Sequence, residues 1–359
     1  MPRQNDLAKT AYDSLPPQAF SLLLAWYRAH KRAMPWREDP TPYHVWISEI
    51  MLQQTRIEAV LPYYERFLAA FPTVQSLAEA EEDRVLKAWE GLGYYSRARN
   101  LKKAAKEIVQ TYGGTLPDSA AQLRKLPGIG DYTAGAIASI AYGKSEPAVD
   151  GNVLRVFTRL TACKDDIMQP ATRRAVTESL RSIYPTGRDA GDLTQGIMEL
   201  GETVCLPNAL PRCSECPLAS LCLAYRENAV LQYPVKSPKK ERRVLQKTVF
   251  LLSESGRFAL RKRQEKGLLA GLWELPNTEG RLSPEEAAAF LQKEGLRVLS
   301  IAPCGEAKHI FTHVEWQMIG YRVECAAPQN GFLWKTAAEI AEGYAIPTAF
   351  AFYKKRLTE

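Results

Sequence analysis

Apolar residues recur at three- and four-residue spacing from residue 18 to about residue 225, as in Val85-Leu86-Trp89 and Leu101-Ala105-Ile108. This period predicts helices throughout the segment, with Pro and Gly marking the loops between them. Residues 233–243 then hold two prolines and five basic residues with little apolar content, which is typical of a linker.

The pattern changes after this linker. Short strand-like runs over residues 245–253, 258–262 and 317–324 predict strands, and residues 284–295 predict one helix among them. A chain of 359 residues is too long for one typical compact domain. We therefore expect two domains: a mostly α domain over residues 1–225, a basic linker over 226–243, and an α+β domain over 244–359.

Composition and charge narrow the class of protein. The 46% apolar and 24% charged content is ordinary for a soluble globular protein. No apolar run approaches the roughly 20 residues of a spanning helix, and the first 17 residues lack the apolar core of a secretory signal. We therefore expect a cytoplasmic protein with no membrane partner, and we also expect it to be a monomer.

The net charge of +7 is concentrated in one stretch. Residues 226–263 hold eleven Lys or Arg and three Asp or Glu, so that stretch carries +8 and the remainder of the chain −1. Such a segment suits a polyanion, because neutralised phosphates release condensed counterions. A solvated, positively charged linker explains the same run equally well.

Four of the seven cysteines form the strongest local signal. Their spacing is C-x7-C-x2-C-x5-C, and they are Cys205, Cys213, Cys216 and Cys222. Four thiolates in one short loop can hold either a 4Fe-4S cluster or a single zinc ion, and the spacing alone does not choose between them. Disulfides are disfavoured by the expected cytoplasmic location.

Two glycines, Gly128 and Gly130, stand in a Leu-Pro-Gly-Ile-Gly turn that leads into a run of small residues. Glycine permits positive φ and close backbone approach, so amides at the start of the following helix are able to hold a phosphate. An ordinary connection between two helices is the alternative.

Glu49 is predicted to lie on a largely apolar helical face. Val45, Trp46, Leu52 and Gln53 surround it at i−4, i−3, i+3 and i+4. Burial disfavours a charged carboxylate, so we expect the pKa of Glu49 to rise toward the range of a proton donor near neutrality. A structural glutamate paired with a cation is the alternative.

Asp150 precedes a helical run, where Asp is a preferred N-cap. We expect the helix amides to keep the pKa of Asp150 low, leaving an anion opposite the Glu49 proton donor. Such a pair suits acid-assisted cleavage of a glycosidic bond, with the anion stabilising an oxocarbenium-like sugar. Capping alone is the simpler explanation.

Together these motifs resemble the endonuclease III superfamily and, within it, the MutY family of adenine DNA glycosylases. The resemblance rests on Leu-Pro-Gly-Ile-Gly at residues 126–130, SEIMLQQT at residues 48–55, VDGNVLRV at residues 149–156, and the cysteine loop. It implies a helix-hairpin-helix that holds the backbone of double-stranded DNA, and a 4Fe-4S cluster on the four cysteines. The superfamily spacing has six residues in the first cysteine gap, and this chain has seven.

The resemblance also implies roles for individual residues in excising adenine opposite 8-oxoguanine or G. Glu49 would protonate adenine N7 and later activate water, Asp150 would stabilise the cation, and Tyr132 and Asn152 would support both. The expected adenine pocket consists of Trp36, Arg37, Ile57 and Gln195. The expected DNA contacts are Gln54, Thr55, Tyr94, Gly128 and Gly130, with Gln54 and Tyr94 wedged into the duplex.

Tyr132 bears on the reaction, because members of the superfamily that also cut the strand have a lysine nucleophile at this position. The resemblance therefore implies a glycosylase that uses water and lacks an efficient lyase step. An endonuclease III-type glycosylase and lyase of other base specificity remains the alternative enzyme, and a purely architectural DNA-binding protein the alternative class.

The second domain contains Gly271-Leu-Trp-Glu-Leu-Pro276, which resembles the opening of a Nudix fold such as the MutT-like domain of the MutY family. The carboxylate run that holds magnesium in Nudix hydrolases is missing from the following helix. The resemblance implies a domain that inspects 8-oxoguanine through the triplet Phe311, Thr312 and His313, where the family has Phe-Ser-His. A domain that only stabilises the chain is the alternative.

Overall fold

The computed structural model of the protein describes residues 12, 15, 16, 18–238, 241–264, 266–326 and 331–358. Residue contacts divide the chain into two compact units. Unit 1 comprises residues 1–60, 73–78 and 103–238, and unit 2 comprises residues 61–72, 79–102 and 239–359. Unit 2 therefore combines two pieces of the helical segment with the C-terminal part of the chain. Lys239 and Lys240 of the expected linker lie outside the described residues.

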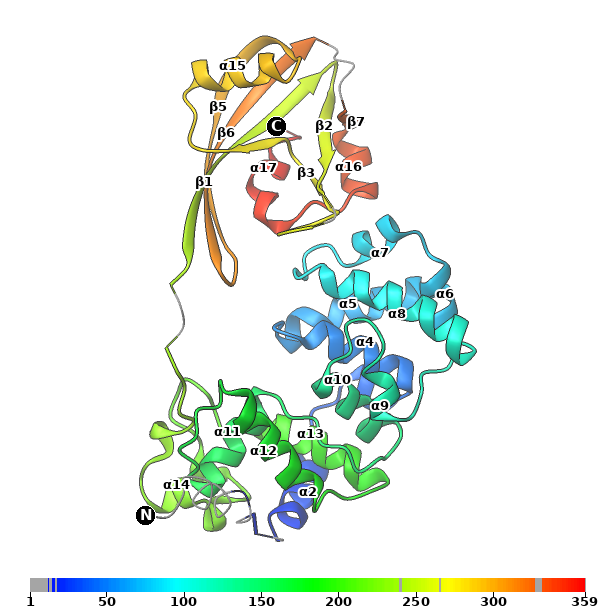
Figure 1. Ribbon diagram of the computed structural model, residues 1–359, viewed down its shortest axis with the longest axis vertical. Coiled ribbons are helices and arrows are strands. Elements are labelled where there is room, and N and C mark those ends of the chain that lie inside the picture. The colour runs from blue at the N-terminus through cyan, green and yellow to red at the C-terminus, as the bar shows by residue number, and fades with distance from the viewer. Residues whose placement is uncertain are drawn as a thin grey trace. The chain divides into compact units, whose positions relative to one another are not determined.

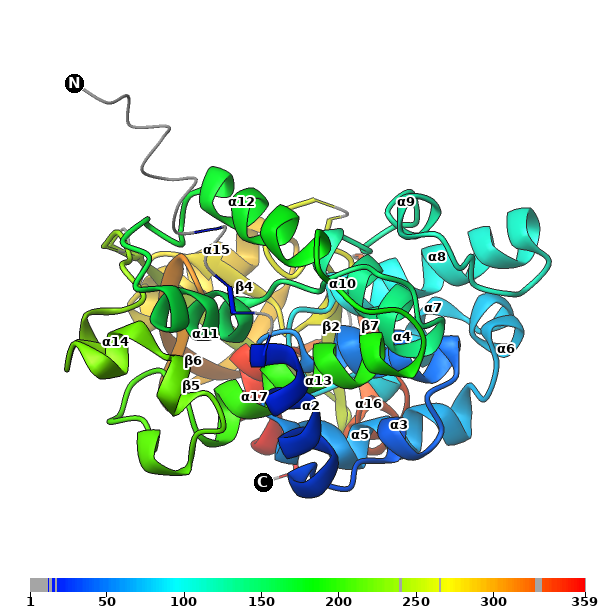
Figure 2. The ribbon, with the colours of Figure 1, turned by 90° about the horizontal axis from the view of Figure 1, so that it is seen from below.

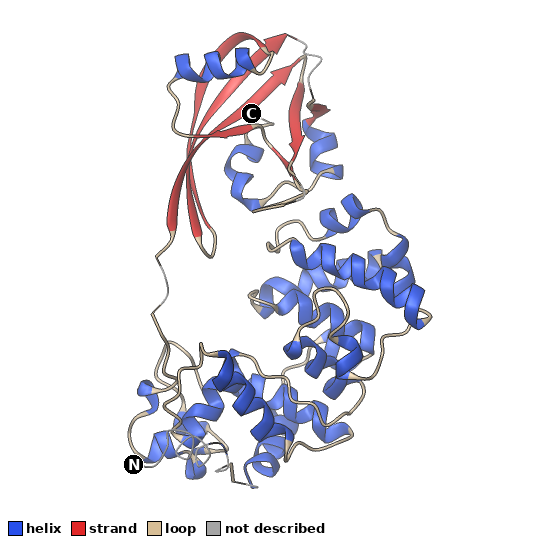
Figure 3. Cartoon of the chain, viewed as in Figure 1, coloured by secondary structure: helices blue, strands red, loops and turns tan. Residues whose placement is uncertain are grey.

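The chain up to residue 232 is helical, as the apolar period predicts, and Figure 3 shows the strands confined to the C-terminal part. The α-helices are α2 (Gln18–His30), α3 (Pro35–Glu38), α4 (Pro42–Leu52), α5 (Ile57–Ala70), α6 (Val74–Glu79), α7 (Glu82–Ala88), α8 (Ser96–Tyr112), α9 (Ala120–Leu123), α10 (Asp131–Ala136), α11 (Gly151–Thr161), α12 (Pro170–Arg181), α13 (Arg188–Thr203) and α14 (Leu223–Arg226). A π-helical turn, η1 (Ile137–Ala141), extends α10, and short 3-10 turns follow as η2 (Cys213–Glu215), η3 (Ala219–Leu221) and η4 (Val230–Gln232). None of the described helices combines the length and apolar character that crossing a bilayer requires.

The core of unit 1 forms where α2, α11 and α13 pack together, and α2 lies beside α13 in Figure 2. Its buried residues include Leu23 of α2, Leu154 of α11 and Leu193 of α13. Helix α11 begins where Asp150 caps it, because the Asp150 Oδ1 accepts a hydrogen bond from the Val153 N–H at 2.8 Å. The cap predicted from the sequence is therefore confirmed.

The Leu-Pro-Gly-Ile-Gly turn connects α9 to α10. Gly128 has φ +78°, in the left-handed region that favours glycine, and Gly130 is the N-cap residue of α10. The small residues that follow are buried in α10. The predicted turn leading into a helix of small residues is therefore present.

Unit 2 is built on a mixed sheet whose strand order is β3-β2-β1-β6-β5, with β4 paired to β1 and β7 to β2 (Figure 1). Strand β1 runs parallel to β6, and β5 runs antiparallel to β6. The strands are β1 (Arg243–Glu254), β2 (Arg257–Lys262), β3 (Trp273–Glu274), β4 (Asn277–Glu279), β5 (Arg297–Ile310), β6 (Val314–Ala326) and β7 (Leu333–Thr336). The helices are α15 (Pro284–Lys293), α16 (Ala337–Gly343), the 3-10 turn η5 (Thr348–Phe350) and α17 (Ala351–Lys355).

Both faces of this sheet are covered, which explains why residues 249–252 of β1 form an uninterrupted apolar run. Val249 and Leu251 belong to the core cluster that includes Ile340 of α16 and Tyr353 of α17. The neighbouring Phe250 and Leu252 belong to the opposite cluster, with Leu291 of α15. A strand buried on both faces has no polar side to alternate with.

The three predicted strands are confirmed as β1, β2 and β6, and the predicted helix is confirmed as α15, but the sequence prediction is incomplete. The structure adds β3, β4, β7, α16 and α17, and it adds the long strand β5. Strand β5 lies at the edge of the sheet, exposes most of its residues and has register shifts near Val298 and Pro303. An exposed edge strand interrupted by bulges carries little periodic apolar signal.

Candidate active site

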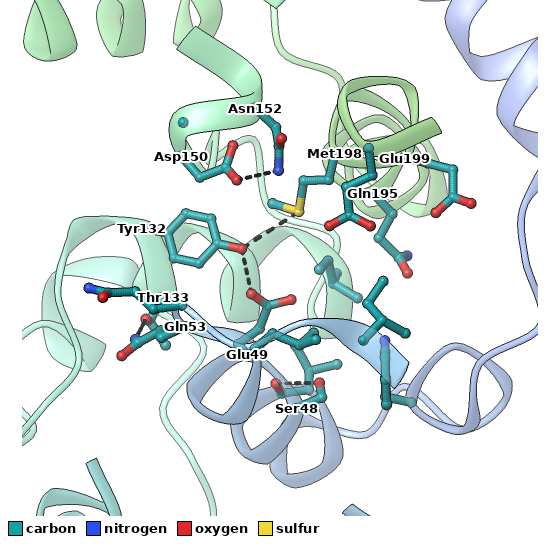
Figure 4. A pocket seen from close by; sticks show the side chains of 18 of the residues that line it. Ser48, Glu49, Gln53, Tyr132, Thr133, Asp150, Asn152, Gln195, Met198 and Glu199 are labelled. Atoms are coloured by element: carbon teal, nitrogen blue, oxygen red, sulfur yellow. Dashed lines mark hydrogen bonds between the residues drawn. The ribbon is translucent and has the colours of Figure 1, made fainter. Parts of the chain in front are cut away.

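Unit 1 contains a cavity of about 640 Å³ between α3, α4, α10, α11 and α13 (Figure 4). This volume is within the range of roughly 300–1,000 Å³ that is usual for small-molecule sites. The predicted site residues that line it are Trp36, Arg37, Glu49, Gln54, Ile57, Gly130, Tyr132, Asp150, Asn152 and Gln195. All eight residues predicted for catalysis and adenine binding thus lie around one cavity.

Glu49 lies on α4, which buries most of its residues, and only 6% of Glu49 is exposed. The Tyr132 hydroxyl donates a hydrogen bond to Glu49 Oε2 at 2.6 Å. Burial raises the pKa of Glu49 from 4.5 to about 7, even though the Tyr132 hydrogen bond acts in the opposite direction. The carboxyl is therefore able to hold a proton near neutral pH, as the apolar neighbours in the sequence predict.

Asp150 and Asn152 face Glu49 and Tyr132 across the cavity (Figure 4). The Asn152 amide donates to Asp150 Oδ2 at 2.9 Å. The expectation of a low pKa for Asp150 is wrong, because burial raises its pKa. The hydrogen bonds from Val153 and Asn152 lower the pKa, but desolvation has the larger effect.

A hydrogen-bonded chain continues from Asp150 to the cysteine loop. Buried Arg155 donates from Nη2 to Asn152 Oδ1 at 2.7 Å and to Gly201 O at 2.7 Å, and from Nε to Cys205 O at 2.8 Å. Gly201 allows the close approach of α13, because a Cβ there would lie 2.7 Å from the Cβ of Asn152. The orientation of Asn152, and through it that of Asp150, therefore depends on both α13 and the cysteine loop.

The wall near Trp36 and Arg37 contains a network that the sequence did not reveal. Glu199 is 1% exposed and accepts hydrogen bonds from Arg32 Nε at 2.5 Å and from Arg37 Nη2 at 2.7 Å. The buried Nε of Arg37 has no hydrogen-bond partner among the described residues. The cavity wall therefore holds a fixed cation with one donor that no described residue engages.

Helix α13 supplies more of the cavity than the single residue Gln195 that was expected. Met198, Glu199 and Glu202 also line it, at i+3, i+4 and i+7 from Gln195. Helical periodicity applied to Gln195 would have found all three. Arg173 of α12 is a further lining residue, exposed and bonded from Nη1 to Val149 O at 2.5 Å.

The predicted DNA contacts of unit 1 lie where helices end. Gln54 is exposed after the end of α4 and has φ +58°, a left-handed conformation that is uncommon for a non-glycine residue. Thr55 follows, with its hydroxyl bonded to Gln53 O at 3.4 Å, and it is not among the cavity residues. Gly128 lies in the α9–α10 turn and also does not line the cavity.

The remaining predicted DNA contacts belong to unit 2. Phe311, Thr312 and His313 form the tight loop between β5 and β6, closed by the Phe311 N–H donating to Val314 O at 2.8 Å. Tyr94 is 47% exposed, has φ +47°, and its hydroxyl lies 3.0 Å from Thr312 Oγ1. The structure thus brings the expected wedge residue and the expected reading loop into contact.

The four cysteines line a second, small and largely apolar cavity beside α11 and α13. The Arg159 guanidinium contributes a hydrogen bond to Cys205 Sγ at 3.2 Å. The segment between Cys205 and Cys213, which is one residue longer than in the superfamily, forms an exposed bulge over residues 207–210. The bulge is closed at its base because the N–H groups of Leu206 and Arg212 both donate to Val204 O, at 3.1 and 3.0 Å. The additional residue is therefore accommodated without separating Cys205 from the other three cysteines.

Comparison with known families defines the class of protein. The model described as "HhH-GPD superfamily base excision DNA repair protein" matches residues 47–184, which hold Glu49, the glycine turn and Asp150. A NUDIX domain model matches residues 248–355. The chain therefore combines a helix-hairpin-helix base-excision repair domain with a Nudix domain.

Similar proteins specify the family further. The chain is 37% identical to the adenine DNA glycosylase of Arabidopsis thaliana, over 81% of this chain and 55% of that protein. It is 33% identical to the adenine DNA glycosylase of Homo sapiens, over 92% of this chain and 73% of that protein. The chain therefore belongs to the adenine DNA glycosylase family.

Solved structures agree with the fold of the helical part. A thermostable thymine-DNA glycosylase is similar at a TM-score of 0.53 and 27% identity, over 58% of this chain and 96% of that one. An endonuclease III–DNA covalent intermediate is similar at a TM-score of 0.50 and 25% identity, over 60% of this chain and 99% of that one.

Proposed function

We propose that the protein hydrolyses the N-glycosidic bond of adenine paired with 8-oxoguanine or G in double-stranded DNA. The observation that carries the proposal is the pair formed by Glu49 and Asp150 in one cavity. Glu49 is buried with a pKa of about 7, and Asp150 faces it with hydrogen bonds that favour its anion. The cavity suits a base that has left the duplex stack, because the bond is unreachable within the stack.

Glu49 supplies the proton in this proposal. Its acid form protonates N7 of the flipped adenine, so that the C1′–N9 bond breaks and adenine leaves with that proton. Asp150 accepts hydrogen bonds from the Val153 N–H and from the Asn152 amide, whereas Glu49 accepts one from the Tyr132 hydroxyl. We therefore expect Asp150 to ionise first and to stabilise the oxocarbenium-like sugar while Glu49 remains protonated.

Water completes the reaction. After adenine has left, the Glu49 carboxylate accepts a proton from the water that attacks C1′, which regenerates the acid. Tyr132 holds the Glu49 carboxyl in place, and Asn152 holds that of Asp150. Trp36, Arg37, Ile57 and Gln195 would enclose the base.

We further propose that the enzyme lacks an efficient strand-cleaving step. That step needs an amine to form a Schiff base with C1′. The described residues that line the cavity include no lysine, and Tyr132 occupies the position where the lyases of the superfamily have one.

The Nudix domain would inspect the base opposite the adenine. Thr312 presents a hydroxyl at the tip of the β5–β6 loop, where Phe311 and His313 flank it. In α15, Glu286 completes a capping box with Ser283, with the Glu286 carboxylate accepting from the Ser283 N–H at 2.8 Å. Because that carboxylate caps the helix, it is not available to bind the magnesium ion that nucleotide hydrolysis requires. This favours recognition over hydrolysis.

A 4Fe-4S cluster is the proposed cofactor. The four cysteines line one small, largely apolar cavity. Four cysteine thiolates around one cavity are the ligand set of a 4Fe-4S cluster, which the resemblance to the family implies. Cys205, Cys213, Cys216 and Cys222 would hold it, and it would tie the end of the helical part together.

The decisive experiment uses duplexes that contain A opposite 8-oxoguanine, A opposite G, or thymine glycol. Incubation followed by alkali should break the strand at adenine in the first two, and omission of alkali should leave it intact. Borohydride should trap no covalent adduct. Breaks at thymine glycol without alkali would instead establish an endonuclease III-type lyase, and the absence of any break at adenine would refute the proposal.

The cofactor has its own test. Purified protein should be yellow-brown with an absorbance band near roughly 400 nm, the expectation for iron-sulfur ligation by cysteine. Replacing Cys216 with Ser should remove the band. A colourless protein that contains stoichiometric zinc would contradict this part of the proposal.

A further inference from the structure

Glu90 forms an unusual junction within unit 2. Its side chain is 18% exposed and accepts three hydrogen bonds, one of them from a backbone amide. Lys87 Nζ donates to Oε2 at 2.5 Å, and Lys354 Nζ and the Ile346 N–H donate to Oε1 at 2.6 and 3.0 Å. One carboxylate thus joins the end of α7 to the α16–α17 region of the Nudix domain.

Helix α7 makes further contacts with the Nudix domain. The Trp273 indole N–H donates to Asp83 Oδ2 at 3.3 Å, and within the Nudix domain the Trp273 ring packs edge-on against Tyr344 at 5.3 Å. Lys87 Nζ also donates to Tyr344 O at 3.3 Å. These contacts place Glu90 at one end of a docking surface formed by α7 with the Nudix domain.

Glu90 is followed directly by the loop that carries Tyr94. Gly91, Gly93 and Tyr94 all have positive φ, so the loop has a specific conformation that most sequences would not adopt. The buried side chain of Arg97 stabilises this loop by donating hydrogen bonds to the carbonyls of Leu92 and Gly93 at 3.1 Å each. The loop is therefore fixed at its Glu90 end by the Nudix domain and along its length by Arg97.

The contact between Tyr94 and Thr312 lies at the far end of this arrangement. The two hydroxyls are 3.0 Å apart, although they belong to parts of the chain separated by 218 residues. Both side chains are exposed, so this single hydrogen bond does not by itself hold the two loops together. The charged junction at Glu90, which is more buried, is better suited to fix their separation.

We propose that Glu90 is a positioning residue that determines specificity for the base opposite the adenine. By docking the Tyr94 loop on the Nudix domain, it makes Tyr94 and Thr312 one composite surface that tests that base. The inference rests on the proposed recognition of 8-oxoguanine. It predicts that Glu90 affects discrimination between 8-oxoguanine and G rather than the chemical step at adenine.

The test compares Glu90→Ala, Glu90→Gln and the wild-type protein on duplexes with A opposite 8-oxoguanine or G. The measured quantities are the dissociation constant and the single-turnover rate of adenine release. Glu90→Ala should reduce the preference for 8-oxoguanine roughly tenfold, in line with loss of a charge-assisted hydrogen bond. Glu90→Gln can still accept from the Ile346 N–H and should restore part of the preference.

The matched control is Glu306→Ala. Glu306 is an exposed carboxylate of the same unit that pairs with Arg281, away from the α7 contacts, so its removal should leave the preference unchanged. Combining Glu90→Ala with Thr312→Val should reduce the preference no further than Glu90→Ala alone, because both changes disrupt one composite surface. If Glu90→Ala does not fold, Lys354→Met removes one donor from the same junction and should lower the preference in the same direction.

The outcomes separate this inference from the function on which it rests. A wild-type protein with no preference for 8-oxoguanine would refute the proposed recognition itself. A wild-type preference that Glu90→Ala and Lys354→Met leave intact, or equal losses on both duplexes, would overturn the role of Glu90 alone.

Discussion

Replacing Glu49 with Gln should make the protein inactive and, above neutral pH, more stable. Burial raises the pKa of Glu49 from 4.5 to about 7, so the folded protein binds a proton that the unfolded chain releases between these values. The contribution of Glu49 to the unfolding free energy of the wild-type protein is therefore fully present below about pH 4.5, and it is lost as the pH rises toward 7. Glutamine is nearly isosteric, accepts the same Tyr132 hydrogen bond, and has no charge to desolvate.

The magnitude follows from the pKa difference. At about 1.4 kcal/mol per pH unit, a shift from 4.5 to about 7 corresponds to about 3 kcal/mol of unfolding free energy at pH 8. For a unit of this size, that amounts to a difference in melting temperature of roughly 5–10 °C. Any effect of amide packing is independent of pH. The diagnostic quantity is therefore how much the melting-temperature difference between Glu49→Gln and the wild-type protein changes between pH 5.5 and pH 8.5.

The assay is thermal unfolding of wild-type protein and Glu49→Gln across this pH range, with DNA cleavage after alkali as the activity measurement. Glu58→Gln, which removes an exposed carboxylate from α5, controls for the loss of a surface charge. A melting difference that is the same at pH 5.5 and pH 8.5 would show that Glu49 does not carry the raised pKa, and the proton-donor argument would fail with it.

Three further predictions concern groups around the same cavity. Tyr132→Phe removes the hydrogen bond that lowers the pKa of the catalytic acid, so the alkaline decline of the excision rate should move upward by about one pH unit. Arg173→Ala should weaken DNA binding and lower its salt dependence by about one counterion, because an exposed cation at the cavity suits a DNA phosphate. The control is Arg174→Ala, which should have less effect because Arg174 does not line the cavity. Gly201→Ala should slow excision roughly 10- to 100-fold without weakening DNA binding, because the new Cβ displaces Asn152 and so disturbs the catalytic anion.

The features that the sequence predicts are those determined by near neighbours in the chain. The position of Glu49 on an apolar face follows from residues three and four positions away, and the cap at Asp150 follows from the helix it precedes. The pKa of Asp150 was predicted in the wrong direction. The helix-cap hydrogen bond is predicted correctly, but burial by distant parts of the chain outweighs it.

Other features depend on contacts between distant residues and have no local signal. Glu199 is buried because Arg32 and Arg37, more than 160 positions earlier in the chain, pair with it. Strand β5 exists because β6 pairs with it, while its own exposed, bulged sequence does not predict a strand. Neither follows from periodicity, which measures only how one segment distributes its own apolar residues.

The two carboxylates that matter most in our proposals differ in how they are stabilised, and the difference follows from their tasks. Glu49 must release and regain a proton, so the fold places it among apolar residues where its anion is disfavoured by desolvation. Glu90 must hold two parts of the chain at a fixed separation, so it remains partly exposed and accepts hydrogen bonds from two ammonium groups and a backbone amide. Exchanging these environments would abolish both functions, because apolar neighbours at Glu90 would offer no donors to join the two parts, and a paired anion at Glu49 would have no proton to give.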